Sequence, residues 1–316
     1  MTHRIAVIGG DGIGPEVVAE ALKVVRATGV ALATTEFDLG AAIGATDVPP
    51  GIIERGLLLR LRFELDLYVN LRPARLYDDR LSPLRDPARR GIDLLIVREN
   101  TEGLYVGMGG RFRRGTEHEV AVQEDLNTHH GVGRILEQGF RRARRRLCMV
   151  DKSNAMNHAG GLWQERWAEA RAAHPELETR HLYVDAAAME LVRDPTQFEV
   201  IVTGNLFGDI LSDLTAALVG GMGVAPSANI NPETRRGLFE PVHGSAPGIA
   251  GQGIVNPVGG ILTAGMMVEH LGDEDAAKRM ESAVTAAIRA GECTRDLGGS
   301  LSTREAADAV IGRLRD

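Results

Sequence analysis

Short apolar runs alternate with long amphipathic stretches along this chain. The runs have the continuous apolar character of strands that are buried on both faces. The stretches between them, such as 131–146 and 162–173, have apolar residues at helical spacing. The strand-like runs lie at 4–8, 92–97, 147–150 and 200–203. This alternation predicts an α/β protein with a largely parallel sheet.

A glycine-rich turn follows the first predicted strand. Residues 9–14 read Gly-Gly-Asp-Gly-Ile-Gly, and Pro15 then occupies the first position of a predicted helix that Gly29 ends. The spacing differs from the G-x-G-x-x-G of dinucleotide-binding Rossmann domains, and no acidic residue follows a second strand at the usual distance. The turn therefore argues against a Rossmann fold.

Charge and cysteine content restrict the classes of function. The chain has 36 Lys and Arg against 43 Asp and Glu, a net charge of −7, which argues against a basic face that binds nucleic acid. Cys148 and Cys293 are the only cysteines, so a disulfide framework is not expected. No apolar run reaches the ~18 residues that a membrane span needs, and residues 1–4 lead into a strand without a signal peptide. We expect a cytoplasmic protein that handles small molecules and binds neither nucleic acid nor membrane.

The densest polar stretch, residues 203–213, follows a predicted strand and opens a helix. Asp209 and Asp213 are four residues apart, so their side chains share one helix face. The two charges repel unless a cation lies between them, and carboxylate oxygens suit Mg²⁺ or Mn²⁺. Compensation of the helix dipole is the alternative, and it explains Asp209 better than Asp213. Asp185, at the end of another strand-like run, is a candidate third carboxylate.

A second group of candidate residues is basic. Arg62 lies in a predicted helical turn, Arg72 in the sequence Asn-Leu-Arg-Pro, and Arg98 just after a predicted strand. The fork of an arginine binds a carboxylate through two hydrogen bonds. These arginines are a candidate cradle for a di-acid, and ordinary surface arginines are the alternative. The arginine run at 141–146 is interpreted as a solvated helix face.

Three further features are weak when taken singly. Tyr105 and Lys152 are candidate proton-transfer groups, although a lone Tyr or Lys is usually structural or solvated. Residues 240–247 form a loop of small residues whose backbone N–H groups could approach a phosphate. His243 within this loop is by itself typical of an ordinary loop histidine.

Together these motifs resemble the metal-dependent β-decarboxylating dehydrogenases of 2-hydroxy acids, the isocitrate/isopropylmalate/tartrate dehydrogenase family. Five motifs occur in the family's order and cover nearly the whole chain. They lie at 10–16, 70–73, 97–103, 205–209 and 240–247. The resemblance implies two α/β domains that share a mixed sheet, in a fold that is not a Rossmann fold. We expect residues 1–68 plus 220–316 to form the cofactor-side domain, and 69–219 to form the metal-binding and dimerisation domain.

The resemblance also implies roles for the acidic and proton-transfer candidates. Mg²⁺ or Mn²⁺ would bind Asp209 and Asp213 of one subunit and Asp185 of its partner in a homodimer with shared active sites. Lys152 would cross the same interface and remove the hydroxyl proton of the substrate. Tyr105 would protonate the enol that remains after decarboxylation.

Substrate and cofactor contacts follow from the same resemblance. Arg62, Arg72 and Arg98 would hold the carboxylates of the substrate. A nicotinamide cofactor, NAD with NADP left open, would bind residues of one loop and two asparagines. These are His243, Gly244, Ser245, Ala246, Pro247, Asn256 and Asn154. NAD-using members generally carry an aspartate after the Ser-Ala-Pro, where it accepts a hydrogen bond from the adenosine ribose. This chain has Gly248 there, which leaves the choice between NAD and NADP open.

The residues before Arg62 bear on substrate choice. Isocitrate enzymes of the family place a serine and an asparagine there, whereas this chain has leucines, of which Leu58 and Leu59 would contact the substrate. An apolar wall suits an isopropyl group, whose burial contributes ~1.5–3 kcal/mol. We therefore expect oxidative decarboxylation of 3-isopropylmalate. Segments 115–120 and 226–229 look closer to tartrate and D-malate enzymes, which are the alternative.

The chain is also short for this family. Between residues 37–41 and 47–50 the family carries a helix and a strand, a piece of roughly 30 residues on the scale of a βαβ unit. Residues 41–45 read as a junction of two distant segments, and a smaller contraction falls within 141–146. If a strand is missing, a folded dimeric scaffold without turnover is a further candidate.

Overall fold

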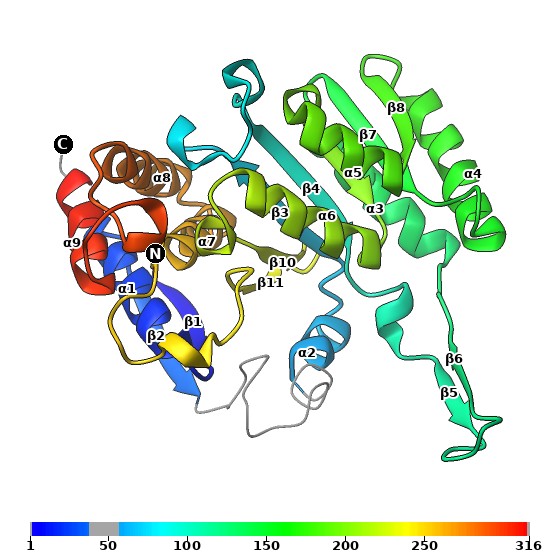
Figure 1. Ribbon diagram of the computed structural model, residues 1–316, viewed down its shortest axis with the longest axis horizontal. Coiled ribbons are helices and arrows are strands. Elements are labelled where there is room, and N and C mark those ends of the chain that lie inside the picture. The colour runs from blue at the N-terminus through cyan, green and yellow to red at the C-terminus, as the bar shows by residue number, and fades with distance from the viewer. Residues whose placement is uncertain (1, 38–56, 315–316) are drawn as a thin grey trace.

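The computed structural model describes residues 2–37 and 57–314. Its largest element is a seven-stranded mixed sheet in the order β11-β10-β3-β4-β9-β7-β8 (Figure 1). The strands from β11 to β4 are antiparallel neighbours, and those from β4 to β8 are parallel. In sheet order they are Arg236–Phe239, Ala228–Asn231, Val69–Arg75, Asp93–Glu99, Val200–Thr203, Arg146–Asp151 and Glu178–Tyr183. The predicted α/β class with a mixed sheet is confirmed. The largely parallel sheet that the strand–helix alternation predicts is wrong, because the strands from β11 to β4 pair antiparallel.

Helices cover both faces of this sheet. Helices α3 (His129–Arg142) and α4 (Asn157–Ala173) pack on one face, and α5 (Val184–Arg193) and α6 (Asn205–Leu218) pack on the other. Strand side chains alternate between the faces. In β4, Ile96 therefore joins the cluster that includes α6, whereas Val97 joins the cluster that includes α3.

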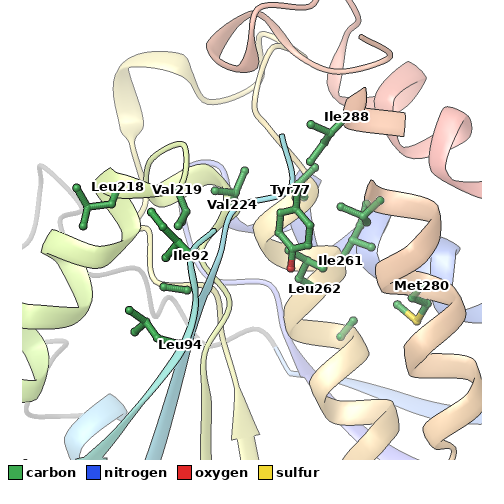
Figure 2. Close-up of a cluster of buried hydrophobic side chains, with 14 of the residues drawn as sticks. Tyr77, Ile92, Leu94, Leu218, Val219, Val224, Ile261, Leu262, Met280 and Ile288 are labelled. Carbon is green, nitrogen blue, oxygen red and sulfur yellow. The ribbon is translucent and has the colours of Figure 1, made fainter. Parts of the chain in front are cut away.

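The larger hydrophobic cluster joins segments that are far apart in the sequence. Tyr77 and Ile92 of the middle segment pack with Ile261, Met280 and Ile288 of the C-terminal helices (Figure 2). Those helices are α7 (Val258–His270), α8 (Glu274–Arg289) and α9 (Thr303–Arg313), and α1 (Gly14–Ala27) packs against α7 and α9. The first residues of the chain are thus held by its last helices.

Two smaller β structures stand apart from the main sheet. Strands β1 (His3–Ile8) and β2 (Leu32–Phe37) pair in parallel, and among the described residues they share no ladder with the seven-stranded sheet. Strands β5 (Gly109–Phe112) and β6 (Val120–Gln123) form an antiparallel arm that projects from the body (Figure 1). The arm exposes Phe112, Val120 and Val122.

Two local expectations are wrong. The helix expected over 131–146 ends at Arg142, because the next residues enter β7 and the Glu199 carboxylate accepts hydrogen bonds from the backbone N–H groups of 144–146. The arginine run is therefore a helix face only at its start. Asp185 does not end a strand, since β8 stops at Tyr183 and Asp185 lies in the first turn of α5. The alanines that follow favour helix, and an acidic side chain there complements the helix dipole.

No described helix is both long and apolar enough to cross a lipid bilayer.

Candidate active site

Close packing of α6 on β4 brings a basic and an acidic motif together. Arg98 lies near the end of β4, and α6 begins directly after the neighbouring strand β9. A Cβ at Gly208 would lie 2.6 Å from the Cβ and Cγ atoms of Arg98, so only glycine lets the helix approach this closely. Asp209, the next residue, is thereby placed within reach of the guanidinium.

Arg98 is buried, and each nitrogen of its guanidinium donates a hydrogen bond at this junction. Its Nε and Nη2 atoms donate to Asn205 Oδ1 at 3.0 and 2.8 Å, and Nη1 donates to Asp209 Oδ1 at 2.5 Å. Burial lowers the pKa of Arg98, the charge of Asp209 raises it, and the nearby charges of Arg72 and Arg62 lower it further. The three predicted substrate arginines thus lie within one electrostatic neighbourhood.

The other two arginines differ in how they are held. Arg72 Nε donates to Asn70 Oδ1 at 2.9 Å, and its guanidinium lies 3.9 Å from both Asp209 and Asp213. Arg62 Nη2 donates to Glu240 Oε1 at 2.8 Å. In the described part of the chain, the buried Nε of Arg62 has no hydrogen-bond partner. A buried N–H without a partner is costly, and an incoming carboxylate would satisfy it.

Tyr105 joins the same group from the short 3₁₀ helix Leu104–Val106. Its hydroxyl donates to Asp209 Oδ2 at 2.8 Å, and Arg98 lies over its ring at 5.4 Å. Burial and the hydrogen bond to Asp209 raise the pKa of Tyr105. The hydroxyl therefore carries its proton at neutral pH, as a proton donor must.

The pKa values of the two aspartates of α6 are shifted in opposite directions. Burial raises the pKa of Asp209, but Arg98, the Tyr105 hydroxyl and Arg72 outweigh it and hold that pKa below its usual value. Burial and repulsion from Asp209 raise the pKa of Asp213. A divalent cation between the two carboxylates would relieve that repulsion, so the oxygen donors present fit Mg²⁺ or Mn²⁺.

Asp185 is not part of this group in the single chain. Its Oδ1 atom accepts from Lys152 Nζ at 2.5 Å, and this hydrogen bond lowers the pKa of Asp185. The described residues contain no cluster of three or more acidic, His or Cys side chains that could hold a metal ion. Asn154 is exposed two residues beyond Lys152 in the turn after β7. Lys152, Asn154 and Asp185 thus form a second group of predicted site residues.

The predicted cofactor loop packs against the N-terminal glycine turn. Ser245 is buried, and its carbonyl accepts from the backbone N–H of Ile13 at 2.9 Å. A Cβ at Gly12 would meet the Ser245 carbonyl oxygen at 2.0 Å, and Gly12 also has a φ of +59°, so glycine is required there on both counts. Two motifs separated by most of the chain therefore form one surface, although neither resembles a Rossmann fingerprint.

Other predicted cofactor residues have partners or conformations that restrict their roles. Burial lowers the pKa of His243, and its buried Nε2 has no hydrogen-bond partner among the described residues. Ala246 has a φ of +36°. Asn256 donates to Asp296 Oδ2 at 2.9 Å and accepts from the Val258 backbone N–H at 3.0 Å, which fixes its orientation.

The leucines before Arg62 are not core residues. Leu58 lies in π-helical backbone that leads directly into helix α2 (Leu59–Glu64). Leu58 and Leu59 are only partly buried, and neither belongs to a hydrophobic cluster of the described residues. The predicted junction at 41–45 lies outside the described residues.

A set of buried amides behind the arginines was not predicted from the sequence. Asn70, Asn100 and Asn229 are fully buried, and the side-chain amides of Asn70 and Asn100 both donate to Asn229 Oδ1. Asn70 stands in the Asn-Leu-Arg-Pro motif and Asn100 beside Arg98, so position within motifs was a usable signal for these two. Asn229 stood out only as the last residue of the segment 226–229, which indicated a substrate class and no structural role.

Comparisons with known proteins identify the family of this chain. The family model for isocitrate/isopropylmalate dehydrogenase matches residues 38–310. The 3-isopropylmalate dehydrogenase of Corynebacterium glutamicum is 48% identical, with 99% of each chain covered, and that of Thermobifida fusca is 46% identical, with 100% of this chain and 98% of the relative covered. Isocitrate dehydrogenase from Methylococcus capsulatus superposes with a TM-score of 0.88 at 37% identity, covering 99% of this chain and 100% of that one.

The alignment with these relatives also shows that this chain is shorter than they are. Against the C. glutamicum relative it runs over 344 positions, 28 more than the 316 residues present here. That relative therefore contains segments without a counterpart in this chain. The identity nonetheless extends over nearly the whole length of both proteins. The family model, the sequence identity and the shared fold together show that the chain belongs to the isocitrate/isopropylmalate dehydrogenase family.

Proposed function

We propose that this protein catalyses the oxidative decarboxylation of 3-isopropylmalate, a step of leucine biosynthesis, with a nicotinamide cofactor and a divalent metal. The observation that carries this proposal is the cradle of three arginines, Arg62, Arg72 and Arg98, beside Asp209. A buried cradle of this charge suits a substrate with two carboxylates. Curated relatives with this name at nearly half identity support the choice of reaction.

The side chains have distinct tasks in this reaction. The arginines hold the carboxylates and orient C2 of the substrate, and the Nε of Arg62, which has no partner among the described residues, donates to one of them. Lys152 removes the hydroxyl proton of the substrate, and a nicotinamide held by the loop 240–247 would accept the hydride from C2. Mg²⁺ or Mn²⁺ on Asp209 and Asp213 would polarise the C2 oxygen and stabilise negative charge as CO₂ leaves. Tyr105 then delivers its proton to the carbon that lost CO₂.

A homodimer completes this site in our proposal. The Asp185–Lys152 pair would extend into the active site of the partner subunit. Within their own chain, both residues lie outside the group that contains Asp209 and the arginines. The exposed apolar side chains of the β5–β6 arm and of α5 and α6 favour such an association. They are Phe112, Val120, Val122, Met189, Val192 and Ile210.

We also propose the two-domain division at 1–68 plus 220–316 and 69–219. The packing of α1 on α7 and α9 supports the grouping of the first and last segments. The site then lies between the domains, with Arg62 on one side and Arg72, Arg98 and Asp209 on the other.

Substrate preference tests the reaction directly. We expect kcat/KM to be highest for 3-isopropylmalate, lower for D-malate and tartrate by ~10–200-fold, and lowest for isocitrate. The extra carboxylate of isocitrate would be buried against leucine without a partner. Leu58→Ala should reduce the preference for 3-isopropylmalate and leave D-malate nearly unchanged. Steady-state kinetics on the four acids measures this.

Two outcomes would contradict this assignment. If D-malate or tartrate is the better substrate of the unmutated protein, the proposed substrate is wrong. If Leu58→Ala lowers the melting temperature and slows all acids equally, the leucine serves the fold. Complete absence of turnover with Mn²⁺ and either cofactor would favour the shortened dimeric scaffold, a candidate supported by the length difference from the relatives.

Cofactor choice is testable at Gly248. A Cβ at this position meets no atom within 4 Å, so a larger side chain fits without rearrangement. We propose NAD as the cofactor and expect Gly248→Asp to lower the KM for NAD by roughly 10-fold, since a charged acceptor of a ribose hydrogen bond contributes about 1.5–3 kcal/mol at most. The KM for NADP should rise because the carboxylate repels the 2′-phosphate. An unchanged KM for both cofactors would place the adenosine ribose elsewhere.

A further inference from the structure

A row of buried polar side chains crosses the antiparallel half of the main sheet. In the strand register, Asn229 of β10 pairs with Asn70 of β3, and Asn70 pairs with Arg98 of β4. Asn70 and Asn229 have no exposed surface, and Arg98 is 2% exposed. Polar side chains in such positions are costly unless every hydrogen-bonding group has a partner.

Asn229 satisfies this condition completely. Its Oδ1 atom accepts from the side-chain amides of Asn70 and Asn100 at 2.9 and 3.0 Å. Its Nδ2 atom donates to the Leu238 carbonyl at 3.0 Å and to Glu240 Oε1 at 3.1 Å. An asparagine side chain has two acceptor sites and two N–H donors, so all four are used here.

The neighbours of Asn229 lead to two of the substrate arginines. Asn70 Oδ1 accepts from Arg72 Nε at 2.9 Å, and Glu240 Oε1 accepts from Arg62 Nη2 at 2.8 Å. An unbroken chain of hydrogen bonds therefore runs from Arg72 through Asn70, Asn229 and Glu240 to Arg62. Glu240 is also the first residue of the loop 240–247.

We propose that Asn229 is a positioning residue that fixes Arg62 and Arg72 relative to each other and to the loop 240–247. This inference rests on the proposed di-acid function of the arginine cradle. The amide suits the task because it is neutral, donates to the carboxylate of Glu240 and accepts from Asn70 at the same time. Glu240, oriented by Asn229, in turn orients the guanidinium of Arg62.

The test compares two isosteric substitutions on the same strand. Asn229→Asp replaces both N–H donors by a carboxylate oxygen that faces Glu240. Asn231→Asp is the matched control, since Asn231 is 4% exposed and its Nδ2 donates to the Asp66 carbonyl and carboxylate at 2.8 and 3.2 Å. Both variants set one carboxylate against another, but Asp66 binds Arg134 rather than a cradle arginine.

Binding and turnover are measured separately. Calorimetric titration with D-malate in the presence of Mn²⁺ should show affinity reduced by roughly 10–100-fold in Asn229→Asp, since a misplacement of about 1 Å in a positioned group costs roughly 100-fold. Asn231→Asp should bind within about 2-fold of the unmutated protein. Adding Asn229→Asp to Arg62→Ala should weaken binding less than Asn229→Asp does alone, because the part of its effect that acts through Arg62 is already lost.

Equal losses in the two aspartate variants, or fully additive losses with Arg62→Ala, would overturn the proposal. If Asn229→Asp does not fold, Asn229→Ser serves instead, with a loss of affinity expected to exceed that of Asn231→Ser. A protein that binds D-malate but turns over no acid would refute the proposed function alone, because the calorimetric comparison needs no turnover. A protein that binds no di-acid would refute both.

Discussion

Mixing two inactive variants, Asp209→Asn and Lys152→Ala, should restore activity. Each variant alone is expected to lose roughly 100- to 10,000-fold in kcat, because one removes a proposed metal ligand and the other the proposed general base. If each site combines Asp209 of one subunit with Lys152 of its partner, a hybrid dimer contains one site with both defects and one with neither. Random exchange should then recover roughly a quarter of the unmutated activity.

The control for this experiment is subunit exchange itself. Differently tagged chains show by co-purification whether hybrids have formed. Mixing Asp209→Asn with Asp213→Asn is the matched negative control, because both changes fall in the same group and no hybrid site is intact. Confirmed hybrids without recovered activity would mean that Lys152 acts within its own chain, and the shared site would have to be abandoned.

Asp213→Asn should raise the Mn²⁺ concentration needed for half-maximal activity by roughly 100-fold or more, since even residues that only support metal ligands contribute 10- to 100-fold. The metal-free protein should not lose stability. Burial and Asp209 raise the pKa of Asp213, so its charge above that pKa disfavours the folded state, and the neutral amide removes this cost. The stabilisation by Mn²⁺ in a thermal melt should disappear.

Asp308→Asn is a suitable control for this variant. Asp308 also lies on a helix, and its side chain is 51% exposed compared with 52% for Asp213. Its loss should leave the metal dependence unchanged. An unaltered Mn²⁺ requirement in Asp213→Asn would mean that the Asp209–Asp213 spacing only adjusts the charge of the helix.

Strands and helices that depend mainly on neighbouring residues could be predicted from the sequence. The strands at 92–97 and 200–203 follow from continuous apolar runs, and the helix at 205–218 follows from the polar turn before it. The residue at which one element ends and the next begins was harder to predict, as at Arg142. Helical periodicity does not show where the following strand starts to pair. Asp185 was misplaced for the same reason.

Contacts between distant segments could not be predicted from spacing. The sequence indicated Arg62, Arg72 and Arg98 as candidates, but their common neighbourhood depends on tertiary packing. The role of Gly12 against Ser245 was equally hidden, since a glycine turn has the same pattern whatever it packs against. Asn229 looked like an ordinary loop or strand residue because its significance lies entirely in its four partners.

The packing of α1 on α7 and α9 has a consequence for how the protein is made. During synthesis the apolar face of α1, with Val17, Val24 and Val25, leaves the ribosome long before residues 258–313 exist. At about 5–20 residues per second this face stays uncovered for roughly ten seconds or more. The nascent N-terminal segment must therefore be shielded, by a chaperone or by transient contacts, until translation is nearly complete.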